Sequence, residues 1–216
     1  MTSLRWLVHS EAGDGHTNED VVEVRPHPSD VNLILCALAD GQGGQVGGAK
    51  AAQVAVEESL RTSSLFPALE LSKADPWYAI LGAADEAVSE HDAAGYCTLI
   101  SLCISSRKVQ GASCGDSGVL LLNGGQDFLL TENQRKNPPV GSSAAHPVAF
   151  EANLQPGWSL LALSDGVWKF VGWECIIQLA ADNKAQKLVT ALRQAALDAG
   201  GGRMQDDFSL ALFFDE

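Results

Sequence analysis

The sequence predicts an α+β domain in which helices pack on antiparallel sheets. Three observations support this prediction: apolar or alternating runs follow one another in groups, helical periodicity appears in pairs of segments, and the connections are short and rich in Gly, Asn and Asp. Strands and helices do not alternate strictly, as they would in a parallel sheet. The 216 residues are enough for one core, so we expect a single domain over residues 1–216.

The strand candidates are short runs that are either apolar or alternate between apolar and polar residues. In chain order they cover residues 4–8, 21–24, 33–39, 97–104, 109–113, 119–122, 128–130, 159–163 and 208–214. Between two of them, Asn123-Gly124-Gly125 is the signal of a hairpin turn. Neighbouring strands are therefore predicted to be antiparallel.

The helix candidates are segments whose apolar residues recur with a helical period. They cover residues 49–60, 76–90, 173–181 and 185–197, and the last is followed by the sequence DAGGG. The stretch at 131–147, TENQRKNPPVGSSAAHP, is polar and contains proline. We interpret it as a surface loop within the domain.

Charge and cysteine content narrow the classes of function. The formal net charge is −13 and the pI is near 4.6, which disfavours binding to nucleic acid or to an anionic membrane, because both need a basic surface. The five cysteines are odd in number and form no CxxC pair, so we expect reduced core residues. No apolar stretch is long enough for a signal sequence or a membrane span, and the expected location is cytoplasmic.

Acidic residues stand at the ends of several predicted strands. Glu19 and Asp20 precede one strand, Asp40 ends another, Asp165 follows LALS, and Asp206 precedes FSLALFF. An aspartate at such a position is commonly a turn or helix cap. Here the phrase Asp-Gly follows an apolar strand twice, in ALADG and LALSDG, and the first copy continues into GQGG. Carboxylates on rigid strand ends beside bare backbone favour a divalent metal site.

Six motifs in order resemble those of the metal-dependent type-2C (PPM) protein serine/threonine phosphatases in their short bacterial form. They are NED at 18–20, ADGQGG at 39–44, YCTL at 96–99, GDSG at 115–118, LALSDGVW at 161–168 and QDDFSLAL at 205–212. The resemblance spans residues 13 to 214. It implies a four-layer α-β-β-α sandwich, with two antiparallel sheets flanked by helices and a two-metal centre at one edge.

The resemblance also implies a set of metal ligands. Asp40, Asp165 and Asp206 are expected to bind through their side chains, with Asp40 bridging two ions. Gly41 is expected to contribute its carbonyl oxygen, and Glu19 to bind the second ion directly or through water. Ligation by oxygen alone favours Mn²⁺ or Mg²⁺.

Other residues receive supporting roles from the same resemblance. Asp20 is expected to orient a metal-bound water, Thr98 and the turn Gly115-Asp116-Ser117 to support the site from beneath, and Asp207 to have a secondary role. The implied reaction is attack on a phosphorylated protein, the product of a serine/threonine kinase, by a hydroxide held between the two ions. This reaction requires no phospho-enzyme, and the sequence contains no CxxxxxR phosphate loop.

The chain departs from the family pattern where the phosphate is gripped. The family usually carries an arginine four residues before the NED glutamate, and this chain has Gly15 there. We hypothesise that His16, or another basic group from elsewhere, takes its place. The aspartate that often supports a third metal would fall at Ala93, with Asp92 adjacent, so a third site is doubtful.

Three alternatives compete with a phosphatase. The first is a catalytically weak or inactive relative that serves as a binding or regulatory module, favoured by the missing arginine. The second treats GQGGQVGGAK as a nucleotide loop, but the sequence lacks GxxxxGK[ST]. The third is an aspartyl-phosphate enzyme, which would need DxDx[TV] where this chain has ADGQG.

Overall fold

The computed structural model describes residues 4–42 and 47–215. These residues form two five-stranded sheets, and every strand pairing within them is antiparallel. One sheet has the order β1-β10-β9-β6-β7 and the other β2-β3-β4-β5-β8. The strands are β1 (Leu4–Glu11), β2 (Asp20–His27), β3 (Asp30–Asp40), β4 (Leu99–Ile104), β5 (Lys108–Cys114), β6 (Gly118–Asn123), β7 (Gln126–Leu129), β8 (Val148–Asn153), β9 (Ser159–Leu163) and β10 (Phe208–Asp215).

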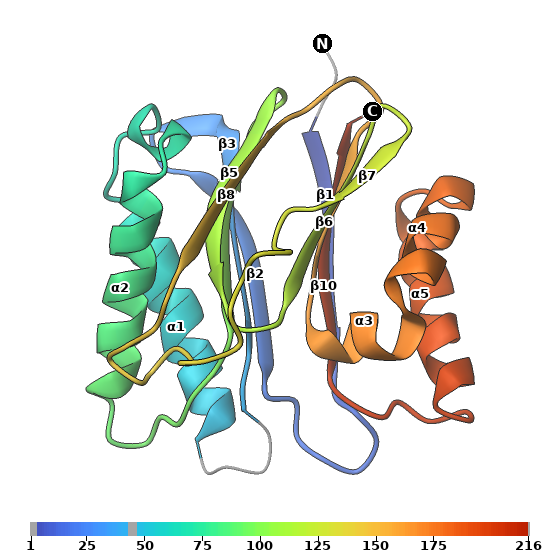
Figure 1. Cartoon of the computed structure of the whole chain (residues 1–216), viewed down its shortest axis with the longest axis horizontal. Helices are drawn as coiled ribbons and strands as arrows, with labels where there is room; N and C mark the ends of the chain where they lie inside the picture. The colour runs from blue at the N-terminus through green and yellow to red at the C-terminus, as the bar shows by residue number, and fades with distance from the viewer. Residues whose placement is uncertain (1–3, 43–46, 216) are drawn as a thin grey trace.

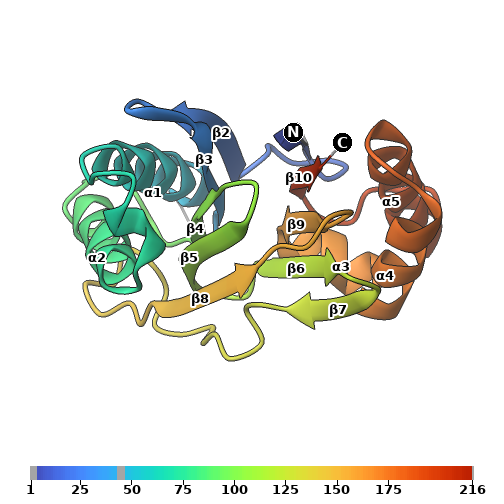
Figure 2. The same ribbon diagram turned by 90° about the horizontal axis from the view of Figure 1, so that it is seen from above.

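Helices cover the outer face of each sheet, so the predicted four-layer sandwich is confirmed (Figure 1). The helices are α1 (Gly48–Ser63), α2 (Asp75–Ser89), α3 (Asp165–Val171), α4 (Trp173–Asp182) and α5 (Gln186–Ala199), with a 3₁₀ turn at Glu70–Ser72. Seen from above, α1 and α2 flank one sheet while α3, α4 and α5 flank the other (Figure 2). None of these helices has the length and apolar content that crossing a membrane requires.

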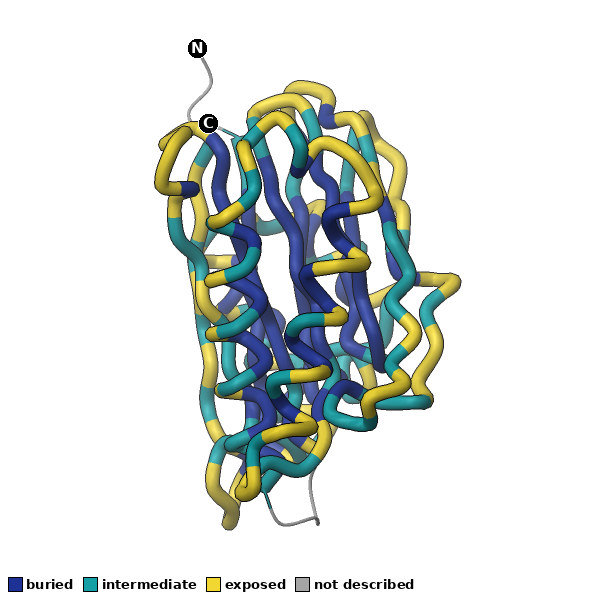
Figure 3. The backbone as a smooth tube through the Cα atoms, turned by 90° about the vertical axis from the view of Figure 1, so that its left-hand side faces the viewer, coloured by how far each residue is buried: buried dark blue, intermediate teal, exposed yellow. Residues whose placement is uncertain are grey.

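Three apolar clusters fill the spaces between the four layers of helices and sheets. One lies between α1, α2 and their sheet, one between the two sheets, and one between the second sheet and α3 to α5. Strand β3 contributes to two of them, because successive side chains point to opposite faces: Leu35 and Ala37 face the helices, and Cys36 faces the other sheet. This two-sided burial explains the continuous apolar run LILCALA, and Figure 3 shows the strands buried behind the helices.

Several element predictions need correction. The edge strand β8 was not predicted, because Phe150 is its single buried residue and the alternation is weak. Helix α3 was not predicted either, because it has seven residues and begins directly after β9. The strand expected from residue 97 begins at Leu99, and Cys97 instead forms isolated bridges to Gly41 and Val140.

The prediction for the cysteines holds for four of the five. Cys36, Cys97, Cys103 and Cys114 are buried and free, whereas Cys175 is exposed on α4. The stretch 131–147 contains no helix or strand, as predicted. It is not wholly a surface loop, because Thr131 and Val140 are buried.

Candidate metal centre

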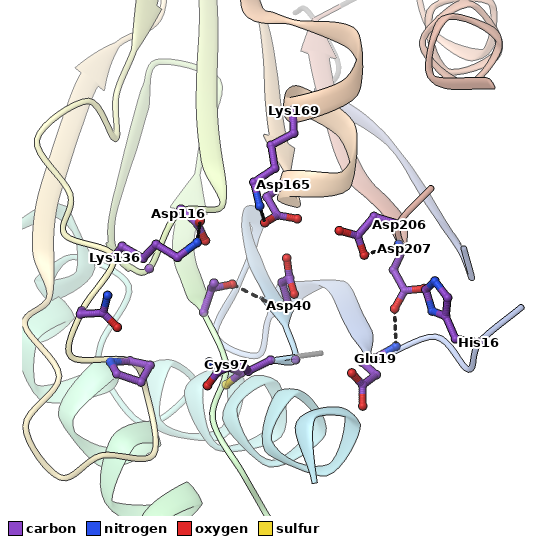
Figure 4. A pocket seen from close by; sticks show the side chains of 16 residues that line it. His16, Glu19, Asp40, Cys97, Asp116, Lys136, Asp165, Lys169, Asp206 and Asp207 are labelled. Carbon is purple, nitrogen blue, oxygen red and sulfur yellow. Dashed lines mark hydrogen bonds and ion pairs between the residues drawn. The ribbon is translucent and has the colours of Figure 1, made fainter. Parts of the chain in front are cut away.

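A cavity of about 350 Å³ opens where ends of both sheets meet (Figure 4). Its lining combines acidic and basic side chains with backbone from the glycine-rich segments. The lining residues are His16, Glu19, Asp40, Gly41, Gln42, Cys97, Thr98, Gly115, Asp116, Lys136, Asn137, Pro139, Asp165, Lys169, Asp206 and Asp207. Of the seven residues that the sequence analysis named as catalytic or metal-binding, the cavity gathers six, and Asp20 is the exception.

Three aspartate carboxylates point toward one another inside this cavity (Figure 4). Asp40 is the last residue of β3, Asp165 is the first residue of α3, and Asp206 lies two residues before β10. Strand β3 belongs to one sheet, whereas α3 and β10 continue from or belong to the other. The acidic cluster therefore lies at the boundary between the two halves of the sandwich and takes residues from both.

Burial and mutual repulsion make this cluster a strong acceptor of positive charge. Burial, followed by the nearby charges of Asp20 and Asp165, raises the pKa of Asp40 to about 9. Burial and the charge of Asp165 also raise the pKa of Asp206. A cation between these oxygens would compensate the crowded negative charge.

Glycine follows both aspartates for a steric reason. A Cβ on Gly41 would overlap the backbone of Gly48, and a Cβ on Gly166 would overlap the carbonyl oxygen of Asp207. The first contact brings the end of β3 against the start of α1, and the second brings the start of α3 against the start of β10. The Asp-Gly phrase thus allows close packing of the segments that carry the carboxylates.

Asp20 lies in a layer beneath the cavity. It pairs with Asp40 across the β2–β3 ladder and is 7% exposed. Burial raises the pKa of Asp20 to about 8, against the opposing effect of hydrogen bonds from Ser164 and Ser209. Its Oδ2 atom is buried and has no hydrogen-bond partner among the described residues.

Glu19 lines the cavity, but its side chain points away from the three aspartates (Figure 4). Its Oε1 atom lies 3.1 Å from where a Cβ on Gly48 would stand, at the start of α1. The Glu19 backbone is fixed on both sides: its N–H donates to Asp207 Oδ2 at 2.6 Å, and its carbonyl accepts the Gly41 N–H at 3.1 Å.

Asp207 has a larger structural role than the sequence indicates. One oxygen accepts the Gly13 N–H at 2.8 Å, and the other accepts the Glu19 N–H. Its Oδ1 also lies 3.4 Å from Nδ1 of His16, which is half-exposed at the cavity rim. Asp207 therefore ties the segment before β2 to the start of β10. The paired acids of QDDF were the available signal, but their partners are too far away in sequence to be predicted.

Two lysines on the opposite wall were missed by the sequence analysis. Lys169 donates to Asp165 one helical turn earlier, and this bond raises the pKa of Lys169 although partial burial opposes the change. Lys136 donates to Asp116 at 2.6 Å. The i,i+4 spacing could have indicated the first pair. The second pair joins two loops and has no such signal.

The predicted support beneath the site is present. Thr98 Oγ1 accepts the Asp40 N–H at 3.0 Å, and the Thr98 N–H donates to the Asp40 carbonyl at 2.8 Å. The Thr98 hydroxyl also bonds to Ser117 Oγ at 2.7 Å. The YCTL and GDSG motifs thus fix the end of β3.

The donor set fits a hard divalent cation, although its side chains do not form a closed shell. No three His, Cys, Asp or Glu side chains among the described residues surround one point as a complete metal site. Asp165 is paired with Lys169, Asp206 accepts the Asp207 N–H, and the Glu19 side chain points away from the three aspartates. The remaining donors are carboxylate and carbonyl oxygens, which suit Mg²⁺ or Mn²⁺.

The four-layer sandwich with an acidic cluster at one edge is the arrangement implied by the resemblance to the metal-dependent type-2C phosphatases. The family model described as Stage II sporulation protein E (SpoIIE) matches residues 34–213, and the chain belongs to that family. The relationship predicted from the six motifs is confirmed at the level of family and fold. No curated protein matches the sequence.

Solved bacterial phosphatases share the fold over almost their whole length. The catalytic domain of the serine threonine protein phosphatase PstP, in complex with two manganese ions, is 22% identical, with a TM-score of 0.79 and coverage of 100% of this chain and 99% of that one. The Mycobacterium tuberculosis enzyme PstP/Ppp is 21% identical, with a TM-score of 0.80 and 99% of both chains covered. The serine/threonine phosphatase of S. agalactiae is 18% identical, with a TM-score of 0.82 and coverage of 99% and 100%.

Proposed function

We propose that this protein is a metal-dependent phosphatase that hydrolyses phosphoserine and phosphothreonine in proteins. The observation that carries the proposal is the convergence of Asp40, Asp165 and Asp206 from different sheets on one cavity. Family membership and the phosphatases that share the fold support the same reaction. The substrates are phosphoproteins produced by a serine/threonine kinase.

Different residues of the chain have different roles in the proposed reaction. Asp40, Asp165 and Asp206 would hold two Mn²⁺ or Mg²⁺ ions through their side chains, and Gly41 through its carbonyl. Glu19 would turn inward to join the second ion directly or through water, and Asp20 would accept a hydrogen bond from water at the floor of the site. When bound, such ions supply Lewis-acid activation of water and neutralise phosphoryl charge.

The site draws residues from both sheets, which supports treating the whole chain as one functional domain. The four buried cysteines are free thiols, which supports a location in the reducing cytoplasm.

A catalytically weak or inactive regulatory module is the second candidate. It is favoured by Gly15 in place of arginine and by the bond of Lys169 to Asp165, which occupies one proposed ligand. Both candidates predict the same fold, and turnover separates them.

The proposed function is tested by titrating manganese into the wild-type protein and following release of p-nitrophenol from p-nitrophenyl phosphate and of phosphate from phosphothreonine peptides. We expect saturable, metal-dependent turnover, which Asp165→Asn reduces by at least about a hundredfold while weakening manganese binding in calorimetry. The control variant is Asp127→Asn, which changes an exposed aspartate on β7. Manganese binding without turnover would favour the regulatory module, and absence of binding would overturn the proposal.

A further inference from the structure

We infer that Lys136 binds the phosphoryl group of the substrate, in the role left open by glycine at position 15. The inference rests on the proposed function and deepens it, because it names the group that recognises phosphate. It starts from the chemistry of the cavity. A phosphate monoester carries nearly two negative charges. Most of the charged side chains in the lining are acidic, so the ester needs a cation beside the metal-binding oxygens.

Among the described residues, three basic side chains line the cavity: His16, Lys136 and Lys169. His16 lies beyond Asp207 at the rim, away from the aspartate cluster (Figure 4). Lys169 is bonded to Asp165 and is 40% exposed, so its charge already neutralises part of the charge of a proposed metal ligand. Lys136 is bonded to Asp116, which the ligand set does not include.

The position of Lys136 suits exchange between Asp116 and a phosphate. Its side chain is 65% exposed, against 20% for Asp116, and it extends from the 131–147 stretch into the cavity wall (Figure 4). Exposed ion pairs contribute little to stability, so the lysine can leave its carboxylate partner for a more highly charged anion. Lysine is well suited to this exchange, because its ammonium is a compact charge on a flexible stem.

The backbone on both sides of Lys136 is anchored. The Arg135 carbonyl accepts the Gly115 N–H at 3.0 Å, and Val140 exchanges two hydrogen bonds with Cys97. On the other wall, the Asp116 carbonyl accepts the indole N–H of Trp168 at 3.0 Å. The Trp168 ring stacks on Trp173 at 5.6 Å between centroids. The backbone around Lys136 is therefore fixed beside the cavity, and only its flexible side chain needs to move to bring the ammonium group to a phosphate.

A purely structural role for Lys136 predicts a different result, and two variants separate the roles. Lys136→Met and Asp116→Asn both remove the ion pair, but Asp116→Asn leaves the cation in place. If Lys136 binds phosphate, Lys136→Met raises KM for p-nitrophenyl phosphate and the inhibition constant of inorganic phosphate by about tenfold. Asp116→Asn, which also changes the turn that supports the site, raises both constants less than Lys136→Met does, and Lys136→Arg retains most of the affinity.

The matched control is Lys73→Met. Lys73 is 60% exposed and pairs with Glu70 at 2.7 Å, outside the cavity, so its loss reproduces the charge change without touching the site. We expect wild-type constants for this variant. Equal increases in KM for Lys136→Met and Asp116→Asn would overturn the inference, as would no increase for Lys136→Met.

The outcome of this test is separable from that of the proposed function. If the wild-type protein turns over substrate and Lys136→Met does not differ from it, the inference fails and the phosphatase stands. If the wild-type protein shows no metal-dependent turnover, the phosphatase fails. Calorimetry of inorganic phosphate with the magnesium-loaded proteins then decides on Lys136: weaker binding by Lys136→Met supports the inference, and equal or undetectable binding by both proteins overturns it.

Discussion

At the scale of single residues, the acidic centre is costly for the fold that carries it. Asp20 and Asp40 face each other in one strand pair near Asp165, and Asp20 is buried while Asp40 is partly buried. Carboxylates in this position repel one another and lose their hydration, which is why their pKa values are raised. The crowded carboxylates lower the stability of the folded protein at the place where the site needs negative charge, a trade-off that is common at functional sites.

Asp40→Asn should therefore separate stability from metal binding. At pH 8 burial keeps Asp40 protonated in the folded protein, whereas it ionises in the unfolded chain, and asparagine removes this cost of folding. The substitution should therefore raise the melting temperature of the metal-free protein by at least about 2 to 4 °C, or about 1 kcal/mol for a domain of this size. The increase in melting temperature on adding manganese should disappear. Differential scanning calorimetry with and without manganese measures both effects, with Asp127→Asn as control. A large loss of metal-free stability together with a retained manganese effect would contradict the prediction.

The candidate acids could be predicted from the sequence because each belongs to a local motif. Asp40 and Asp165 lie in Asp-Gly phrases after apolar strands, and Asp206 precedes the last strand. The contacts of Lys136 and Asp207 could not be predicted, because they join segments far apart in the chain. The outward direction of Glu19 could not be predicted either, because it depends on how β2 meets the start of α1.

At the scale of elements, the 131–147 stretch is held by a buried carboxylate on α2. Asp85 is 6% exposed and accepts three backbone N–H groups, from Gly141 at 2.7 Å, Ser143 at 3.2 Å and Ala145 at 3.1 Å. These bonds act as a substitute for regular secondary structure, since the stretch has none of its own. They fix the segment that carries Lys136 beside the cavity.

Asp85→Ala should destabilise the protein and loosen this segment. Loss of the charged acceptor leaves three N–H groups without their partner, at a cost on the order of 3 kcal/mol. Urea denaturation measures that cost, and hydrogen exchange should show faster exchange at residues 141–145. Glu86→Gln, on the exposed face of the same helix, is the control and should change neither quantity. Unchanged exchange at 141–145 in Asp85→Ala would show that Asp85 does not anchor the segment.

Elements with strong periodicity were predictable, and short ones were not. Strand β3 is buried on both faces, so its sequence is apolar throughout and unmistakable. Strand β8 is an edge strand and α3 is only seven residues long, and neither contains enough buried positions to produce a pattern. The buried part of the 131–147 stretch was not predicted because Val140 joins the core as an isolated apolar residue, and polar contacts to the backbone hold much of the rest.

At the scale of the whole molecule, the acidic cluster makes stability depend on pH. In the metal-free folded protein, burial keeps Asp20 and Asp40 protonated up to about pH 8 and 9, whereas in the unfolded chain they ionise near the ordinary aspartate pKa of 3.8. Between these limits the unfolded chain binds fewer protons than the folded one. Stability must therefore decrease as pH rises from about 4 to about 9.

This dependence should be visible in denaturation curves. With EDTA present, we expect the free energy of unfolding to fall between pH 5 and pH 9 by about 1.4 kcal/mol per pH unit for each proton retained by the folded state. Saturating magnesium should flatten the curve, because a cation stabilises the ionised carboxylates. Asp40→Asn should flatten it without magnesium. A wild-type profile that rises with pH in EDTA would contradict the prediction.

The pairing of β1 with β10 has a consequence for how the protein is made. Leu4 lies opposite Asp215 and Glu11 opposite Phe208, so β1 finds its only sheet neighbour at the other end of the described chain. The sheet β2-β3-β4-β5-β8 can assemble on the ribosome once residue 153 has emerged, but β1 must wait for β10. Closure of so long a loop is slow. Until β10 has been synthesised, the nascent chain therefore carries an unpaired strand edge, the kind of surface that chaperones shield.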